Sequence, residues 1–365
     1  MTDRDAGLII GIRREDKNVW ERRAPLVPDD VAALRATGLR LRVQPDANRI
    51  FDDGAYRRAG AEVTEDLGPC GLVLAVKEIP LEHIAADTAY VFFAHVVKGQ
   101  AYNMPLLQRL LDLRTSLIDY ERIRDAQGRR LIFFSRHAGR AGMIDTLWTL
   151  GQRLRARGVD SPLADVRQAF RYGSFAAAAD HLRDIGTRLA AAAAQGSAPL
   201  VIGVTGYGNV ARGCHEVLDC LPVAWTTPER LAADAADPAP VRCVEFREQH
   251  MARRRDGGAF DLAEYYAHPE RYTAAFEPWL DHIDVLVNTI YWEPRYPRLV
   301  TRDWARRHPA PRLEVIGDIS CDIEGSVELT LTATMPDAPS YTWDREADRI
   351  RTGVEGPGPA IMAVD

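Results

Sequence analysis

Lysine is nearly absent from this chain of 365 residues. Of its 46 basic residues only Lys17, Lys77 and Lys98 are lysines, and arginine supplies all the others. Arginine stays protonated in proteins, whereas a lysine can lose its proton when it is buried. A lysine that persists in such an arginine-rich sequence is therefore a candidate for chemistry that arginine cannot perform, and this directs attention to Lys77.

Other features that the sequence lacks exclude whole classes of protein. The five cysteines form no CxxC pair and are odd in number, so we expect no metal site, no disulfide framework and reduced thiols in a cytoplasmic protein. No apolar run approaches the roughly 20 residues of a membrane span, and the opening residues do not have the pattern of a signal peptide. The net charge of −6 argues against a nucleic-acid-binding surface.

The remaining composition is that of a folded protein of roughly two or three domains, with 46% hydrophobic residues. Apolar strand patterns alternate with helical ones, which predicts a parallel α/β architecture. Strands are expected at 8–12, 39–44, 72–77, 89–94, 116–119, 131–134, 199–205, 241–246, 284–290 and 313–319. Helices are expected at 28–37, 104–113, 139–157 and 174–194.

The clearest local motif is a GxGxxA loop, Gly206-Tyr-Gly208-Asn209-Val210-Ala211, which directly follows an apolar strand and opens a helix. Gly206 permits the tight turn, Gly208 lets the backbone approach a pyrophosphate, and the small Ala211 allows close packing of helix and strand. The helix N-terminus then offers amide donors to the phosphates. The loop predicts a dinucleotide site, and the alternative is a glycine-rich turn that binds no ligand.

The choice of cofactor should be encoded at the end of the following strand. NAD sites usually place an acidic residue there, about 20 residues after the glycines, to accept the ribose 2′-hydroxyl. Here the strand ends in Thr226 and Thr227, and Arg230 follows closely enough to meet a 2′-phosphate. The sequence therefore favours NADP(H), although Glu229 could still supply the carboxylate of an NAD site.

Lys77 and His95 each close an apolar strand of the first half of the chain. Ligands of α/β proteins bind at the carboxyl ends of parallel strands. A lysine beside an apolar strand can shift toward neutrality and a histidine titrates near neutral pH, so the two suit general acid–base catalysis. The alternative is a pair of solvated polar residues at strand ends.

Arginines are concentrated between the first strand and the first helix, where Arg13 and Arg23 could bind substrate carboxylates through their planar guanidinium groups. Without further information, a solvated arginine-rich loop is the more economical interpretation. Glu78 and Glu121 are also available beside the strand ends, where they could set the charge of Lys77.

An ordered set of motifs covers almost the whole chain. These are WERRAPLVP, VKEIP, FFAH, YNMPLL, RHAGRAGMID, TGYGNV, IYWEPRYPRLVT, GDISCDIEGSVE and VEGPGPAIMAVD. Together they resemble lysine–ketoglutarate reductase, the saccharopine dehydrogenase that forms lysine, within the alanine dehydrogenase and transhydrogenase-like group. The resemblance implies two Rossmann-like domains with parallel sheets and an interdomain cleft. Residues 1–135 plus 319–365 would form the substrate domain, and 136–318 the dinucleotide-binding domain.

The resemblance also implies roles for individual residues. Lys77 and His95 match the acid–base pair, Arg13 and Arg23 the arginines that bind substrate carboxylates, and Glu78 and Glu121 the acids beside the lysine. The residues expected to bind or line the cofactor are Gly206, Gly208, Asn209, Val210, Thr226, Thr227, Arg230, Asn288 and Asp318.

The implied reaction condenses L-lysine with 2-oxoglutarate and reduces the resulting imine with NADPH, which gives saccharopine. Three alternatives stay open: a similar reductase for another amine and keto acid, an alanine dehydrogenase-like enzyme, and a non-catalytic NADP(H)-binding regulatory module. The expected partners are small molecules, without nucleic acid or membrane. The oligomeric state is not readable from the sequence.

Overall fold

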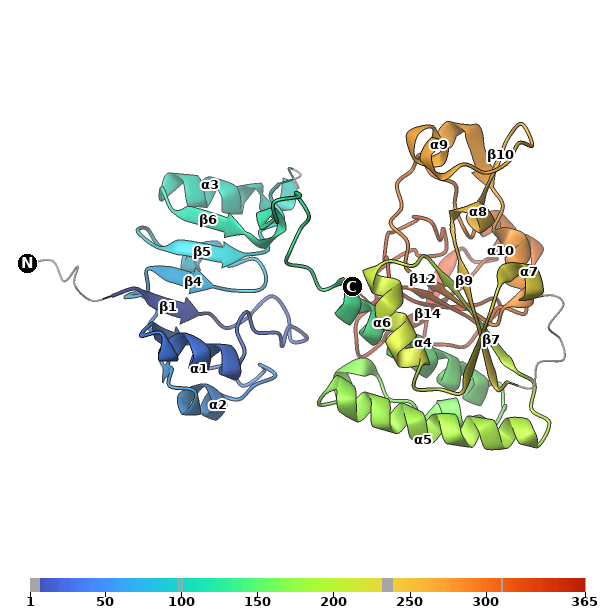
Figure 1. Ribbon diagram of the computed structural model, residues 1–365, viewed down its shortest axis with the longest axis horizontal. Coiled ribbons are helices and arrows are strands. Elements are labelled where there is room, and N and C mark those ends of the chain that lie inside the picture. The colour runs from blue at the N-terminus through green and yellow to red at the C-terminus, as the bar shows by residue number, and fades with distance from the viewer. Residues whose placement is uncertain (1–6, 98, 100, 232–238, 310, 365) are drawn as a thin grey trace, which may run out of the picture. The chain divides into compact units, whose positions relative to one another are not determined.

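The chain divides into two compact units, Met1–Phe133 and Phe134–Asp365. Both are visible in the computed structural model of Figure 1, which describes residues 7–97, 99, 101–231, 239–309 and 311–364. Lys98 lies outside the described residues. No helix in the described ranges is long and apolar enough to cross a membrane. Within the same ranges, no group of three His, Cys, Asp or Glu side chains is placed to bind a metal ion.

Unit 1 is a six-stranded parallel sheet in the order β3-β2-β1-β4-β5-β6, which is the strand order of a Rossmann fold. Its strands are β1 (Ile9–Ile12), β2 (Arg40–Val43), β3 (Glu62–Val63), β4 (Leu72–Leu74), β5 (Ala89–Phe92) and β6 (Ser116–Asp119). Its helices are α1 (Pro28–Ala36), α2 (Asp53–Arg58) and α3 (Met104–Asp112). The first two helices pack on β1 and β2, and α3 packs on β4 and β5, so the apolar side chains of the sheet are divided between two cores.

Unit 2 contains an eight-stranded sheet in the order β15-β14-β16-β13-β12-β7-β9-β8. The strands are β7 (Leu200–Thr205), β8 (Val223–Thr226), β9 (Val241–Phe246), β12 (Val285–Asn288), β13 (Val315–Asp318), β14 (Ser340–Asp344), β15 (Arg349–Thr352) and β16 (Ala360–Met362). Strand β14 is antiparallel to both of its neighbours, and the other pairings are parallel. A separate hairpin joins β10 (Ala252–Arg254) to β11 (Tyr272–Ala274).

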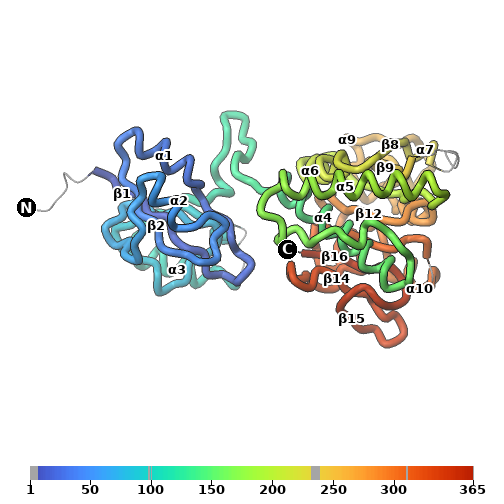
Figure 2. Tube along the Cα trace, turned by 90° about the horizontal axis from the view of Figure 1, so that it is seen from below, coloured from blue at the N-terminus to red at the C-terminus, as the bar shows by residue number. Residues whose placement is uncertain are grey.

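Helices cover both faces of the large sheet because its strands are apolar on both sides. The long helices α4 (Ser135–Ala156) and α5 (Phe175–Ala194) share one core with α6 (Asn209–Leu218). Figures 1 and 2 show the three helices close together. The shorter α7 (Pro228–Leu231), α8 (Glu248–Met251) and α10 (Arg302–Arg307) supply residues to the core on the other face. Helix α9 (Leu262–Ala267) packs on the hairpin.

Two glycines let α4 and α6 approach each other closely. A Cβ atom at Gly139 would lie 2.0 Å from the carbonyl oxygen of Val210, and one at Gly213 would lie 2.0 Å from that of Arg136. A third glycine of α4, Gly142, faces Ile319 beyond β13 in the same way. The AGRAG part of the motif in α4 therefore has a packing role, because it seats α4 against the helix that opens at the glycine-rich loop.

The structure differs from two sequence-based expectations. The resemblance implies that residues 319–365 belong to the first domain, but β16 pairs with β13 and β14 pairs with β16, so this segment completes the sheet of unit 2. The strand expected at 131–134 is not formed, because this apolar run lies beyond β6 with Leu131 and Phe133 exposed. The other expected strands and helices are confirmed, with ends shifted by a few residues.

Candidate functional site

Lys77 and His95 extend from neighbouring strands of unit 1. In the parallel pairing of β4 with β5, Leu74 lies opposite Val91, and the backbone N–H of Phe93 still donates to the carbonyl of Val76 beyond the strand ends. The two side chains therefore begin at the same carboxyl edge of the sheet. This confirms the neighbouring placement on which their pairing was predicted.

Glu78 connects this pair to the surrounding loops. One of its carboxylate oxygens lies 2.6 Å from Nδ1 of His95, and the other accepts a hydrogen bond from Nζ of Lys17 at 3.2 Å. Asn103 donates both to Glu78 and to the carbonyl of Ala94, which fixes the turn before His95. Burial alone would raise the pKa of Glu78, but the hydrogen bond with His95 and the Lys17 ammonium outweigh it and lower the pKa. Glu78 is therefore ionised and orients the imidazole of His95.

Glu15 is a site residue that the sequence analysis missed. Its two carboxylate oxygens accept the backbone N–H groups of Val76 and Lys77, at 2.7 and 3.0 Å, so it fixes the backbone from which the lysine extends. Burial raises the pKa of Glu15 to about 7, although those two donors favour its ionised form. No local motif could reveal this contact, because it joins positions about 60 residues apart in the chain.

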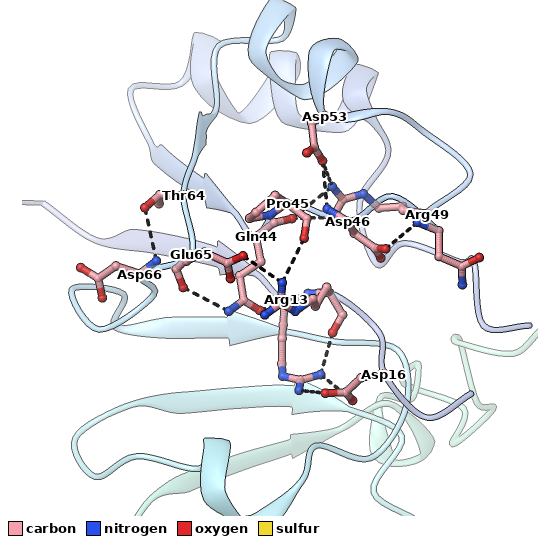
Figure 3. Close-up of polar contacts among 12 residues, drawn as sticks. Arg13, Asp16, Gln44, Pro45, Asp46, Arg49, Asp53, Thr64, Glu65 and Asp66 are labelled. Carbon is pink, nitrogen blue, oxygen red and sulfur yellow. Dashed lines mark hydrogen bonds and ion pairs between the residues drawn. The ribbon is translucent and has the colours of Figure 1, made fainter. Parts of the chain in front are cut away.

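The predicted arginines and Glu121 are each held by an ion pair within the chain. Arg13 is buried and donates to Asp16, with Nη1 3.1 Å from one oxygen (Figure 3). Arg23 donates from Nε to Glu21 at 2.7 Å. Glu121 pairs with Arg130 at 3.2 Å. The local alternation of acids and arginines accounts for the pairs at Arg13 and Arg23, so a substrate carboxylate would have to share these guanidinium groups with Asp16 and Glu21.

Asp119 is another acid near His95 that the sequence analysis did not single out. It ends β6 and is buried, and its Oδ2 atom has no hydrogen-bond partner among the described residues. Burial raises its pKa, and His95 acts in the opposite direction. The ring of Phe93 stacks on His95, with centroids 6.3 Å apart, and contacts Tyr120 at 4.9 Å. The imidazole therefore has an apolar wall on one side and the Glu78 carboxylate at Nδ1.

The GxGxxA loop of unit 2 has the geometry that a dinucleotide requires. Gly206 directly follows β7 and has a φ of +94°, a conformation that favours glycine. Gly208 is the N-cap of α6, and a Cβ atom there would meet nothing within 4 Å, so the loop is open where a pyrophosphate would lie. Ala211 is fully buried against the core. Asn209 and Val210 form the first turn of α6, whose amide groups are directed toward the loop.

Asn288 and Asp318 lie beneath this loop. Asn288 donates to Asp318 at 2.8 Å and accepts from the hydroxyl of Thr205 at 3.1 Å, which links the carboxyl ends of β12, β13 and β7. Ser320 and Thr330 donate to Asp318 as well, and burial raises its pKa despite these bonds. Neither Asn288 nor Asp318 has exposed surface, so their geometry suits support of the strand ends.

The residues expected to select the cofactor lie at the end of an outer strand and just beyond it. Thr226 ends β8, which is the edge of the sheet, and β9 lies between β8 and β7. Thr226 is level with Val244 of β9, which in turn is level with Gly203 of β7. Thr227 and Arg230 follow this edge strand. The cofactor choice was expected at the end of the next strand along the chain, which is β8, whereas the strand beside β7 in the sheet is β9.

Comparisons with known proteins agree with this architecture. Residues 11–141 match the family described as alanine dehydrogenase/PNT, N-terminal domain. A solved L-alanine dehydrogenase superposes with a TM-score of 0.61 and 18% identity, covering 98% of this chain and 82% of that one. The fold is thus shared with that dehydrogenase, which confirms the predicted α/β class with two Rossmann-like domains.

Relatives of known name narrow the identification. The chain is 36% identical over 98% of its length to an alpha-aminoadipic semialdehyde synthase of Arabidopsis thaliana, and 35% identical to a mitochondrial one of Mus musculus. It spans 36% and 41% of the lengths of these two relatives. It is also 26% identical to a saccharopine dehydrogenase (NAD+, L-lysine-forming) of Neurospora crassa, covering 84% of that protein. The chain is a homologue of these proteins, which confirms the resemblance to lysine–ketoglutarate reductase.

Proposed function

We propose that this protein is an oxidoreductase that condenses the ε-amine of L-lysine with the ketone of 2-oxoglutarate and reduces the product with NADPH to saccharopine. The observation that carries the proposal is the arrangement of Lys77 and His95 at adjacent strand ends, with Glu15 and Glu78 fixing them. Homology over 98% of the chain to a protein named saccharopine dehydrogenase (NAD+, L-lysine-forming) supports the choice of substrates.

The chemistry requires groups that can both remove and deliver a proton. The amine must be neutral to attack the ketone, and the resulting carbinolamine must be protonated to lose water as the C=N bond forms. Since the Glu78 carboxylate lies at Nδ1 of His95, Nε2 is the ring atom that exchanges a proton with the substrate. Lys77 extends from the backbone segment that Glu15 holds and acts as the second acid–base group.

Substrate carboxylates require fixed cations, which Arg13 and Arg23 supply in this proposal. The nicotinamide, when bound, supplies the hydride that reduces the C=N bond. Gly206, Gly208, Asn209 and Val210 would hold its pyrophosphate through the open loop and the first turn of α6. Asn288 and Asp318 would support that loop from below. The preference for NADP(H) over NAD(H) is part of this proposal, and a relative is named for NAD+. The sequence assigned that choice to Thr226, Thr227 and Arg230, and the sheet order places these residues at the end of the outer strand β8 and just beyond it.

The test is the decay of NADPH absorbance with purified protein, lysine and 2-oxoglutarate. NADH in place of NADPH, and pyruvate with ammonia in place of the substrates, serve as controls. We expect decay only with the lysine mixture and NADPH. Decay with pyruvate and ammonia would favour an alanine dehydrogenase-like enzyme, and decay with another amine or keto acid would favour a specialised reductase. If NADPH binds but every mixture is silent, the substrate assignment is wrong, and other amines and keto acids must be tested before a non-catalytic nucleotide-binding module is favoured.

Variants of Lys77 test its assigned role in the same assay. Both Lys77→Met and Lys77→Arg should lower kcat by about 100-fold or more, since methionine removes the proton-exchanging group and arginine cannot lose its proton. The affinity for NADPH, measured by fluorescence titration, should not change because the nucleotide loop belongs to unit 2. Full turnover of Lys77→Met would refute the role of the lysine.

The expected location in the cytoplasm also remains a prediction, and the relative from Mus musculus is named as mitochondrial. Cell fractionation of the source organism with an antibody to this chain would test it. Small molecules are the proposed partners, in keeping with the name of the relative from Neurospora crassa, a saccharopine dehydrogenase that forms L-lysine.

A further inference from the structure

The sheet order places the end of β9, and not the end of β8, beside the glycine-rich loop. Strand β9 pairs with β7 along its whole length, with Phe246 opposite Thr205, and the N–H of Gly206 donates to the carbonyl of Phe246 at 2.9 Å. In Rossmann folds the ribose of the nucleotide is recognised from the strand adjacent to the phosphate loop. The first side chains beyond that strand here are Arg247 and Glu248.

Arg247 is held against the loop by two contacts. Its guanidinium carbon lies 4.8 Å from the ring centre of Tyr207, the residue between the two glycines of the motif. Its Nε donates to Glu245 at 3.0 Å. The hydroxyl of Tyr207 donates in turn to Glu248 at 3.2 Å, and Tyr266 of α9 donates to the same carboxylate at 2.5 Å. The Arg247 side chain is 58% exposed, so its outward face is open to a ligand.

Arg230 is less well placed to recognise the ribose of the nucleotide. Arg230 belongs to the four-residue α7, which follows the edge strand β8, two strands and so about 10 Å from β7. The end of β8 is also lower along the sheet, because Thr226 is level with Gly203 and not with Thr205. The neighbouring Glu229 lies 3.1 Å from Nε2 of His250, which gives this carboxylate a partner away from a nucleotide.

We propose that Arg247 binds the 2′-phosphate of NADPH and is the residue that sets the preference for NADPH over NADH. This inference rests on the proposed function, since it specifies the cofactor of the same site. The planar guanidinium can take a phosphate in a bidentate manner while its face remains on Tyr207. Its ion pair neutralises Glu245, the carboxylate that would otherwise repel the phosphate and accept a ribose hydroxyl.

Because Arg247 pairs with Glu245, we expect its loss to change the affinities for NADPH and NADH differently. Loss of Arg247 removes the phosphate ligand and leaves the Glu245 carboxylate without this cation. The affinity for NADPH should fall by about 10- to 100-fold, the range for a lost hydrogen-bonded charge. The affinity for NADH should stay the same or rise, because the carboxylate can then accept the 2′-hydroxyl.

The experiment titrates the full chain with NADPH, NADH and 2′,5′-ADP, following protein fluorescence. The variants are Arg247→Ala, Arg230→Ala and, as a matched control, Arg253→Ala, an exposed arginine of β10. We expect only Arg247→Ala to lose affinity for NADPH and 2′,5′-ADP. The double variant Glu245→Gln/Arg247→Ala should recover part of the affinity for NADPH, because the repelling carboxylate is gone.

Three results would overturn this assignment. They are the same loss in Arg230→Ala instead, an equal loss of NADPH and NADH affinity in Arg247→Ala, and a wild-type protein that binds NADH as tightly as NADPH. The titrations and the turnover assay together distinguish failure of the proposed function from failure of the Arg247 assignment. If the nucleotides bind as expected but lysine and 2-oxoglutarate give no turnover, the substrate assignment is wrong while the role of Arg247 stands. If no nucleotide binds at all, both are wrong.

Discussion

At the scale of single residues, the carboxylates of this protein are set to different charge states by their surroundings. Glu15 and Glu78 lie near the same strand ends, yet burial raises the pKa of Glu15 to about 7 whereas the hydrogen bond with His95 lowers that of Glu78 against the effect of burial. Pairs of acids whose pKa values are pushed apart are typical of sites that perform acid–base chemistry. Here the two acids hold the proposed acid–base groups, because Glu78 lies at Nδ1 of His95 and Glu15 accepts the backbone N–H of Lys77.

Asp145 of α4 provides a pH-dependent prediction. It accepts one hydrogen bond, from the backbone of Ala169, and burial raises its pKa from 3.8 to about 7. Because the folded-state pKa is raised, the stability that this group contributes is fully present below about pH 4 and is lost as the pH rises through 7. Each unit of difference between the folded-state and unfolded-state pKa corresponds to about 1.4 kcal/mol in the free energy of unfolding. The side chain of Asp145→Asn stays neutral. The unfolding temperature of this variant should therefore change less between pH 5.5 and 8.5 than that of the wild type.

Thermal unfolding followed by circular dichroism at the two pH values measures this effect. Asp180→Asn, at an exposed position of α5, serves as the control and should keep the pH dependence of the wild type. An unchanged pH dependence in Asp145→Asn would show that this carboxyl does not bind a proton more tightly in the folded state.

At the scale of elements, the contact between α4 and α6 positions the glycine-rich loop from which α6 begins. Alanine normally stabilises a helix relative to glycine by about 1 kcal/mol. Gly139→Ala should do the opposite and destabilise the protein by about 1–3 kcal/mol, because the new Cβ would lie 2.0 Å from the Val210 carbonyl. Since Val210 belongs to the first turn of α6, the affinity for NADPH should fall as well.

Urea unfolding and NADPH titration measure the two effects. Gly173→Ala is the matched control, because a Cβ there meets nothing within 4 Å and its φ is not positive. A stabilised Gly139→Ala protein with unchanged affinity for NADPH would show that α4 and α6 can move apart without loss of stability or of NADPH binding.

At the scale of the whole molecule, each unit has its own sheet and its own cores. We expect a fragment of residues 134–365 to fold alone and bind NADPH. A fragment of residues 134–318 should fail to fold, because it lacks β16, which pairs with β13, and β14 beyond it. Near-ultraviolet circular dichroism and nucleotide titration of the two fragments measure this. A folded 134–318 fragment that binds NADPH would favour the domain division expected from the sequence.

The sequence by itself determined those features that depend on neighbouring residues. The period of apolar residues indicated most strands and helices, and the glycine spacing at 206–211 predicted the loop that opens α6. The strand ends at Lys77 and His95 were also readable, because a parallel α/β pattern brings the ends of neighbouring strands to one edge.

Only the tertiary structure decided which strands are neighbours and which distant groups meet. The hydrogen bonds of Glu15 to the backbone at Lys77, the place of β9 between β7 and β8, and the pairing of β16 with β13 all join residues far apart in the chain. Local patterns fix the type of an element but not its partner. The partner is selected by the burial of apolar faces and the satisfaction of backbone hydrogen bonds in the complete sheet.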